Sequence, residues 1–325
     1  MTKATNRLSV QRLASTVCRL ASVAAVVSVI CCTANGAPFL VASDFTGQMR
    51  RVDPQTGAIL STVAGGNGAG EIDFGPDGLI YASDFDESRI RRIDPISGLW
   101  IGTIALPGKP RDVTFGPDGQ LYIGLTGTGN GQGTIGVYRY DLASQQLSSR
   151  FNTSVLNGSP IGITFGPGND LWVALDARFS GNGVSSIVRI DGQTGNFEGV
   201  FTSQQINAPQ SLVFDLDGNL DVANSIGGTI TQYAPDGSYL GTLTSGGAKH
   251  GLFLLPDGDL LYGSVDSFYR IDAESHAISV FSTGFRTAAG LVMVPEPTTM
   301  LLAATMAPFI FAVLGRILLN RPATP

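Results

Sequence analysis

Five polar side chains that could bind a metal ion stand at the ends of short apolar segments. They are Glu71, Asp84, Asp176, Asn224 and Asp266. Carboxylate and amide oxygens are the ligands that Ca²⁺ prefers in proteins. If the fold brings these segment ends together, the five residues could form a calcium site. Asp and Asn at such places also cap turns by hydrogen bonding their own backbone, so turn capping is the alternative role.

The histidines bear on acid–base chemistry. His250 directly precedes Gly251 at the start of an apolar segment, where it could serve as a general base. A single histidine without a partner also fits a surface or channel-lining position, which is the alternative for His250. His276 lies in a predicted turn on the other side of the fold. The motifs G-x-S-x-G and H-E-x-x-H and the phosphate-binding loop do not occur in the chain.

These candidates belong to a block that recurs five times. Its aromatic or aliphatic marker stands at Phe74, Phe115, Phe165, Phe214 and Leu254, in steps of 41, 50, 49 and 40 residues. A period in the forties, made of short apolar runs and Gly-rich turns without helical spacing, predicts four β-strands per unit. Such a unit is the blade of a β-propeller, and we expect the Phe to pack between neighbouring blades.

The two ends of the repeat region complement each other. Residues 39–43, 49–53 and 59–63 match the second, third and fourth strands of a unit, whereas residues 290–294 match only a first strand. We therefore predict an all-β, six-bladed propeller over residues 38–294. Its last blade is closed by the N- and C-terminal strands, because an open ring would leave unpaired strand edges.

The same topology assigns each loop to a face. Loops that lead into first strands and loops between second and third strands share one face, and the Pro-Asp-Gly turns lie on the opposite one. Residues 215–221 resemble the start of an EF-hand loop. However, Ile226 occupies the twelfth position, where a bidentate Glu is required, so we interpret this segment as a turn.

The blocks resemble those of NHL-repeat, virginiamycin-lyase-like and gluconolactonase-like propellers. The resemblance rests on F-x-P-D-G-x-L-Y and on R-I-D-P-x-T/S-G at residues 51–57 and 92–98, and it covers nearly all of 38–294. Gluconolactonase-like enzymes hold their ion with a Glu, an Asn and an Asp. Glu71, Asn224 and Asp266 have those residue types, without flanking motifs that would support the transfer. The resemblance therefore implies a fold more than an activity.

The N-terminus predicts a signal peptide over residues 1–37. Lys3, Arg7, Arg12 and Arg19 form a basic region, and an apolar segment follows at residues 20–32. Small residues at 34–37 suit cleavage. A retained membrane anchor and a lipoprotein are the alternatives. All three cysteines lie before residue 33, so the remaining chain has no disulfide and no cysteine-based zinc site.

The C-terminus resembles the PEP-CTERM sorting signal of Gram-negative bacteria. Pro295, Glu296 and Pro297 precede an apolar run at residues 300–314, which is followed by Arg316 and Arg321. In that family the chain is processed by an exosortase, and the protein reaches the cell surface or extracellular matrix, often together with exopolysaccharide. The resemblance implies a sorting segment over 295–325 with a transmembrane helix. An ordinary tail anchor is the alternative.

The charge of the central region argues against nucleic acid as a partner. Residues 38–294 hold 14 Lys and Arg against 25 Asp and Glu, a net charge of 14 − 25 = −11. Phosphate binding needs clustered cations. The balance suits an exported protein that avoids anionic surfaces or recruits divalent cations such as Ca²⁺.

Two neighbouring long loops suggest where a partner binds. Residues 126–134 and 176–185 extend blades two and three on one face and are rich in Gly, Ser and Asn. We expect a binding lip there, with Thr126, Asn130, Asp176 and Asn182 among its contacts. The sequence thus favours a cell-surface or matrix binding module for extracellular polysaccharide. The alternative is a secreted, divalent-metal-dependent lyase or lactonase-like hydrolase that uses the central channel.

Overall fold

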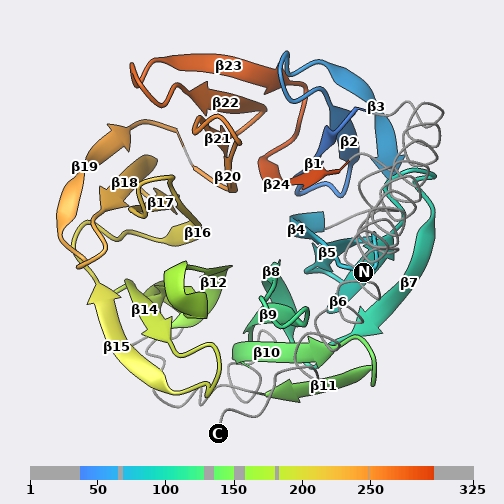
Figure 1. Cartoon of the computed structure of the whole chain (residues 1–325), viewed down its shortest axis with the longest axis horizontal. Coiled ribbons are helices and arrows are strands. Elements are labelled where there is room, and N and C mark those ends of the chain that lie inside the picture. The colour runs from blue at the N-terminus through green and yellow to red at the C-terminus, as the bar shows by residue number, and fades with distance from the viewer. Residues whose placement is uncertain are drawn as a thin grey trace, which may run out of the picture. The chain divides into compact units, whose positions relative to one another are not determined.

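The repeats fold into six four-stranded antiparallel sheets around a common axis (Figure 1). The computed structural model describes residues 37–64, 69–127, 135–149, 158–179, 183–247 and 249–295. Its strands lie within one compact unit, Phe39–Val294. The predicted six-bladed propeller is therefore confirmed. The predicted signal peptide and C-terminal helix lie outside the described residues, apart from Ala37 and Pro295. No helix within the described ranges is long and apolar enough to cross a membrane.

Blades one to three are each built from one stretch of chain. Blade one comprises β4 (Ala69–Phe74), β5 (Ile80–Asp84), β6 (Arg89–Ile93) and β7 (Trp100–Ala105). Blade two comprises β8 (Lys109–Phe115), β9 (Leu121–Thr126), β10 (Gly136–Asp141) and β11 (Gln146–Ser149). Blade three comprises β12 (Ser159–Phe165), β13 (Leu171–Asp176), β14 (Ser186–Ile190) and β15 (Phe197–Thr202), with short 3₁₀ turns η2 (Pro167–Asn169) and η3 (Ala177–Phe179).

Blades four and five continue this pattern, and blade six combines both ends of the domain. Blade four comprises β16 (Pro209–Phe214), β17 (Leu220–Asn224), β18 (Thr229–Tyr233) and β19 (Tyr239–Thr244). Blade five comprises β20 (Leu252–Leu254), β21 (Leu260–Gly263), β22 (Ser267–Ile271) and β23 (Ile278–Thr283). Blade six comprises β24 (Ala288–Val294), β1 (Phe39–Asp44), β2 (Met49–Val52) and β3 (Ile59–Ala64), in that spatial order.

The ring closes through the pairing of β1 with β24. The two strands are antiparallel, with Phe39 opposite Val294 and Ala42 opposite Leu291. Ser43 strengthens the closure, because its hydroxyl accepts a hydrogen bond from the Gly290 N–H (2.9 Å) and donates one to the Gly70 carbonyl of blade one (2.7 Å). The predicted closure by two segments about 250 residues apart is confirmed.

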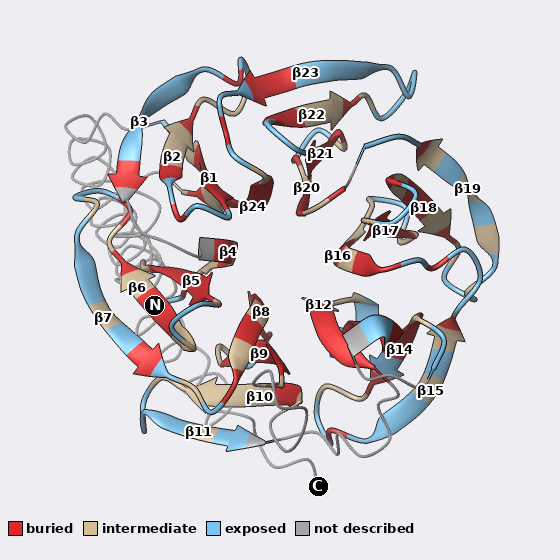
Figure 2. Cartoon of the chain, turned by 180° about the vertical axis from the view of Figure 1, so that it is seen from behind, coloured by how far each residue is buried: buried red, intermediate tan, exposed pale blue. Residues whose placement is uncertain are grey.

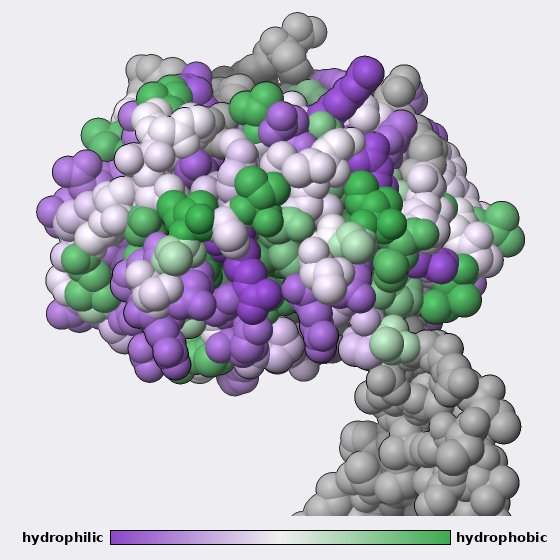
Figure 3. Space-filling model, turned by 90° about the horizontal axis from the view of Figure 1, so that it is seen from above, coloured by the Kyte–Doolittle hydropathy of each residue, from purple (hydrophilic) through white to green (hydrophobic). Residues whose placement is uncertain are grey.

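Burial is lowest on the outermost strand of each blade (Figure 2). The second strands β5, β9, β13 and β17 are buried at every position, whereas the outermost strands β7, β15 and β23 are largely exposed. Apolar side chains such as Leu240, Ile278 and Val280 are exposed on these outer strands. On the rim seen in Figure 3, apolar spots stand apart among polar residues. The core therefore lies between the inner strands of adjacent blades.

An aromatic pair explains the repeated motif at three blade junctions. The strand-two aromatic residue of one blade packs edge to face on the strand-one Phe of the next. The ring centroids are 5.0 Å apart for Tyr81 and Phe115, 4.8 Å for Tyr122 and Phe165, and 5.3 Å for Trp172 and Phe214. Such pairs contribute about 0.5–1.5 kcal/mol beyond the burial of their area. The expected position of the Phe between blades is confirmed.

The Gly and Asp of the motif serve the same pair. A Cβ added to Gly116 would lie 2.6 Å from Tyr122 and 3.0 Å from Phe165, so the rings leave no room for a side chain. The Tyr122 hydroxyl donates a 3.0 Å hydrogen bond to the Asp118 carboxylate of the Pro-Asp-Gly turn. Blade one repeats this arrangement with Tyr81 and Asp77 at 2.9 Å.

Closure by β24 should control the stability of the whole ring. A chain that ends at Gly290 loses the buried side chains of Leu291, Val292 and Val294 and leaves β1 unpaired. We expect its Tm to fall by about 10 °C or more relative to a chain that ends at Pro297, as judged from roughly 1.5–3 kcal/mol per buried side chain. Calorimetry of the two chains tests this expectation, and equal Tm values would contradict it.

Candidate functional site

The structure separates two faces of the ring as the sequence predicts. We call the side with the loops into first strands and between second and third strands the loop face. Its loops contact one another: the Phe45 N–H bonds to the Thr287 carbonyl, and the Ser225 N–H bonds to the Ala208 carbonyl. The opposite side, with the turns between first and second and between third and fourth strands, is the turn face.

Two of the predicted calcium ligands are instead paired with arginine. Asp84 is buried at the end of β5, and its carboxylate accepts hydrogen bonds from Arg89 at 2.8 Å and Arg91 at 2.6 Å. Asp176 is buried at the end of β13 and binds Arg178 of η3 at 2.6 Å. Guanidinium groups thus supply the positive charge that a metal ion would otherwise supply to these carboxylates.

Asn224 ends β17, and Asp266 lies in the turn between β21 and β22. The Asn224 side chain is buried, accepts a hydrogen bond from the Asn207 N–H (2.8 Å) and donates one to the Thr231 hydroxyl (3.0 Å). Asp266 is exposed and accepts a hydrogen bond from Ser267. The Asn224 bond links two loops of the loop face, and the Asp266 bond is to a neighbouring side chain, so the calcium role and the turn-capping alternative both stay predictions. Across the described ranges, no three His, Cys, Asp or Glu side chains are grouped so that they could hold a metal ion.

Glu71 differs from Asp84 and Asp176 because it forms no ion pair with an arginine of the described residues. Burial on β4 raises its pKa from 4.5 to about 7. Its Oε2 atom lies 3.1 Å from where a Cβ would stand on Gly251 or on Gly290, so the carboxyl reaches the inner strand of the adjacent blade six and the segment that leads into blade five. Glycine at these two positions leaves space for it. Glu71 is therefore an acid–base group near neutrality at the inner wall of the ring.

Two further carboxylates near Glu71 link adjacent blades. Asp112 accepts hydrogen bonds at 2.7 Å from the N–H groups of Val113 and of Ile163 in blade three. Asp73 accepts one at 2.7 Å from the Phe115 N–H of blade two. Burial, and then the proximity of Glu71, raises the pKa of Asp112 well above its usual value, and burial raises the pKa of Asp73 to about 6. Neither Asp112 nor Asp73 is among the site residues predicted from the sequence.

His250 lies on the loop face against an aromatic side chain rather than beside a catalytic partner. Its ring packs edge to face on Phe45, with centroids 5.4 Å apart. Its Nδ1 atom is buried and has no hydrogen-bond partner among the described residues, and burial lowers its pKa. Catalysis by His250 stays a prediction, and the channel-lining alternative agrees with its contacts.

Phe45 and Phe85 frame a small pocket on this face. The pocket has a volume of about 100 Å³, and its walls include Gly70, Pro110 and Arg111. The Arg111 guanidinium lies 4.2 Å from the centre of the Phe85 ring, and the Lys109 ammonium lies 4.5 Å from it. We call His250, Phe45 and Phe85, with Lys109 and Arg111, the aromatic arc. It offers aromatic surface beside two cations, whereas the surrounding domain is acidic.

The predicted binding lip is only partly described. Thr126 is buried, and its hydroxyl bonds to the Lys109 carbonyl at 3.2 Å. Asp176 is buried as well, so neither side chain is exposed for ligand contact. Asn130 and Asn182 lie outside the described residues, as do Glu296 and Pro297 of the sorting motif, of which only Pro295 is described.

A repeated dipeptide in the sequence marks the aromatic arc. Asp44 ends β1 and is followed by Phe45, and Asp84 ends β5 and is followed by Phe85, so the same dipeptide closes the second strand of two adjacent blades. The Asp of each pair is engaged in turn and ion-pair contacts. The Phe of each pair is left on the surface between those blades.

Comparison with known proteins supports the fold alone. No protein-family model matches the sequence, and no curated protein matches it. Among solved structures, a chain of a nidogen/laminin complex aligns with a TM-score of 0.65 at 16% identity, over 80% of this chain and 99% of that one. A Bacteroides caccae protein of unknown function gives 0.59 at 14% identity, over 80% and 100% of the two chains. Regucalcin from Agrobacterium tumefaciens, a calcium-binding protein, gives 0.58 at 15% identity, over 71% and 79%.

The raised pKa of Glu71 predicts how stability depends on pH. The folded protein keeps the Glu71 proton up to about pH 7, whereas the unfolded chain loses it near pH 4.5. Stability from this group is therefore full below pH 4.5 and is lost as the pH rises through 7. We expect the free energy of unfolding of Glu71→Gln, relative to that of wild type, to increase by about 1–2 kcal/mol from pH 5 to pH 8. Urea unfolding at both pH values measures the gain, with the exposed Glu87→Gln as control. Parallel profiles for Glu71→Gln and wild type would contradict it.

Proposed function

We propose that this chain is an exported propeller that binds acidic polysaccharide at the cell surface through its aromatic arc. The observation that carries the proposal is the pairing of the half-buried Phe85 ring with Lys109 and Arg111, beside the exposed Phe45, on a domain of net charge −11. An anionic polymer is repelled by most of this surface, so a local pair of cations would fix where it binds.

The chemistry of the arc suits a sugar acid. Phe45 presents an apolar ring against which the C–H groups of a sugar ring can pack, whereas the ring of Phe85 supports the two cations that lie over it. The guanidinium of Arg111 and the ammonium of Lys109 can bind a sugar carboxylate. Asp86, which also lines the pocket, can accept hydrogen bonds from sugar hydroxyls. The pocket is small, so affinity would come from several sugar units along the face rather than from one enclosed residue.

Export and surface attachment rest on the two ends of the sequence. The basic and apolar segments before residue 37 have the order of a signal peptide, and Pro295, Glu296 and Pro297 begin a segment like the PEP-CTERM signal. On this proposal an exosortase-type enzyme is the processing partner, and the membrane holds the chain only before processing. The alternative is a secreted, divalent-metal-dependent lyase or lactonase-like hydrolase that uses the central channel, and it requires a divalent cation site.

Binding should depend on the aromatic arc. We expect Phe45→Ala and Phe85→Ala each to weaken binding to the acidic fraction of the producing bacterium's extracellular polysaccharide by roughly ten-fold, since the first removes an apolar ring and the second removes the ring that supports the two cations. Phe197→Ala is the matched control, because Phe197 is 41% exposed and Phe45 is 37% exposed. Affinity electrophoresis measures the change, with dextran as a neutral polymer. Unchanged binding of the arc variants, or equal binding of dextran, would refute the site. Tight Ca²⁺ binding that is lost in Glu71→Ala or Asp266→Ala would favour the enzyme.

Sorting should depend on the Pro-Glu-Pro motif. Replacement of Pro295, Glu296 and Pro297 by alanine removes the segment that the processing enzyme would recognise. We expect the unprocessed chain to accumulate in the inner-membrane fraction of the producing bacterium, whereas wild type reaches the surface or the medium. Immunoblotting of cell fractions tests this, with the arc variant Phe85→Ala as a control whose sorting should be normal. Normal surface delivery of the alanine variant would disprove the motif's role.

A further inference from the structure

The junction between blades four and five lacks the aromatic pair found at the three preceding junctions. Asp221 faces Val213 across the β16–β17 pair, which is the position that Tyr81, Tyr122 and Trp172 hold in blades one to three. In blade five, Leu254 stands where the strand-one Phe is found. A carboxylate and a smaller aliphatic group thus replace two rings.

A third substitution accompanies these two. Asp215 replaces the glycine that the rings require elsewhere, as at Gly116. Its carboxylate is fully engaged: it accepts hydrogen bonds from the N–H groups of Asp217 and Asn219 and from the side-chain amides of Asn219 and Gln232. These bonds hold the turn between β16 and β17 in place at the edge of the vacated space.

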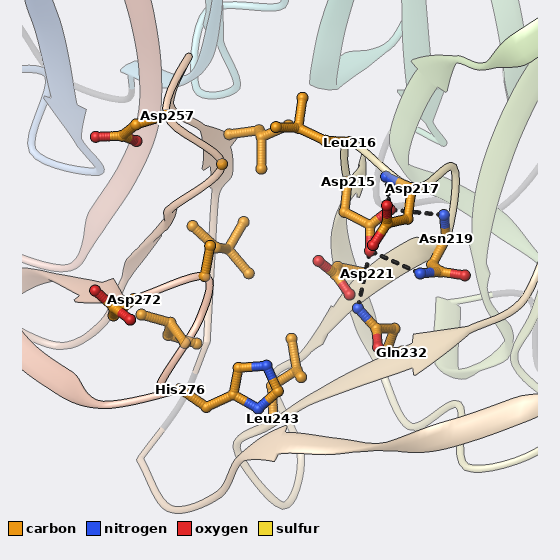
Figure 4. A pocket seen from close by; sticks show the side chains of 15 residues that line it. Asp215, Leu216, Asp217, Asn219, Asp221, Gln232, Leu243, Asp257, Asp272 and His276 are labelled. Carbon is orange, nitrogen blue, oxygen red and sulfur yellow. Dashed lines mark hydrogen bonds between the residues drawn. The ribbon is translucent and has the colours of Figure 1, made fainter.

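The missing rings leave a pocket of about 320 Å³ on the turn face. Its apolar wall is formed by Leu243, Leu254, Leu260 and Ile271. Figure 4 shows carboxylates on both sides of it, with Asp217 and Asp221 on one side and Asp257 and Asp272 on the other, and the His276 ring at its lower edge. None of the described residues that line it is Lys or Arg.

Asp221 is the group within this pocket that the fold does not satisfy. The residue is 2% exposed, and its Oδ1 atom has no hydrogen-bond partner among the described residues. In Figure 4 its carboxyl points into the pocket. A buried carboxylate without a counter-charge is costly, and an apolar or aromatic residue at this position is what the other blades use. The position therefore retains a carboxyl group whose ionised form its own surroundings disfavour.

We propose that this pocket binds a small organic cation, an ammonium or guanidinium group on a short aliphatic stem. The N–H donors of such a group would bond to Asp221, the stem would lie along the leucines and Ile271, and the acidic rim would attract the charge. A bare metal ion fits less well, because the described His, Cys, Asp and Glu side chains form no group of three around one point. This site is on the opposite face from the aromatic arc and does not depend on the polysaccharide proposal.

Butylguanidinium and butylurea test the proposal directly, because they have similar shapes and differ in charge. We expect calorimetric titration at pH 8 to show binding of butylguanidinium and at least ten-fold weaker binding of butylurea. Asp221→Asn should weaken butylguanidinium binding by ten-fold or more, whereas Asp236→Asn, at an exposed turn of the same face, should not change it. Equal binding of the two probes, or an unaffected Asp221→Asn variant, would overturn the proposal. A protein that binds Ca²⁺ but does not bind butylguanidinium would also overturn it.

A refilled pocket provides a variant that should fold well. Asp215→Gly, Asp221→Tyr and Leu254→Phe together recreate the residues of the three aromatic junctions. We expect this triple variant to have a Tm at least equal to that of wild type and to lose butylguanidinium binding. Retained binding in a folded triple variant would place the cation elsewhere and overturn the proposal.

The pH dependence and a peptide analogue refine the result. Burial, and then Asp215, raises the pKa of Asp221 to about 7. Asp217, Asp257, Asp272 and His276 also line the pocket, and Asp257 is paired with Arg270, which is not part of the lining. The carboxyl must lose its proton to bind the cation, so affinity should rise about ten-fold from pH 6 to pH 8. Affinity that falls over this range would contradict the role of Asp221. N-acetyl-arginine methylamide distinguishes two sources of the cation. Binding as tight as that of butylguanidinium would assign the pocket to an arginine side chain of a protein partner, and ten-fold weaker binding would assign it to a free small cation. Both results uphold an organic cation as the ligand.

Discussion

Closure of the ring by the β1–β24 pair is the constraint on which the rest of the structure depends. Each inner strand packs between two neighbours, so an unclosed ring would expose the inner faces of blades five and one as well as the edge of β1. Ser43 shows how the junction is coupled to the next blade, because one hydroxyl bonds to both Gly290 and Gly70. The positions of Glu71, of Gly290 and of the Phe45 loop all follow from this single pairing.

Within the closed ring, packing between blades follows one rule at the three junctions from blade one to blade four. Where a Tyr or Trp packs on a Phe, the residue beside the two rings is glycine because a Cβ would clash with them. In blades one and two the Tyr hydroxyl also donates a hydrogen bond to the Asp of the turn. At blade four the aromatic residue, the Phe and the glycine change together to Asp221, Leu254 and Asp215. A change at only one of these positions would leave either a steric clash or an unfilled void. The joint change instead leaves a single pocket, which is the one proposed to bind a cation.

The sequence was sufficient for the fold because the fold is repetitive. The markers from Phe74 to Leu254 reveal the period, and the incomplete units at both ends require each other. The candidate site was less accessible, because the role of an acidic residue depends on its neighbours. Asp84 and Asp266 follow similar apolar segments in the sequence. In the structure, however, Asp84 is buried and paired with Arg89 and Arg91, whereas Asp266 is exposed. Asp221 also resembles a turn residue in the sequence. Only its alignment with Tyr81 and Tyr122 in the folded blades shows that it replaces an aromatic residue.

The direction of β24 has a consequence for a propeller attached to a surface. The strand begins on the loop face, where the Ala288 N–H bonds to the Ser264 carbonyl, and it ends at Val294, opposite Phe39, on the turn face. The chain therefore leaves the ring on the turn face. The pocket beside Asp221 opens on the face where the chain leaves, whereas the aromatic arc lies on the opposite face, so a proposed tether after Val294 would begin on the side of the small pocket and leave the arc unobstructed at its point of exit.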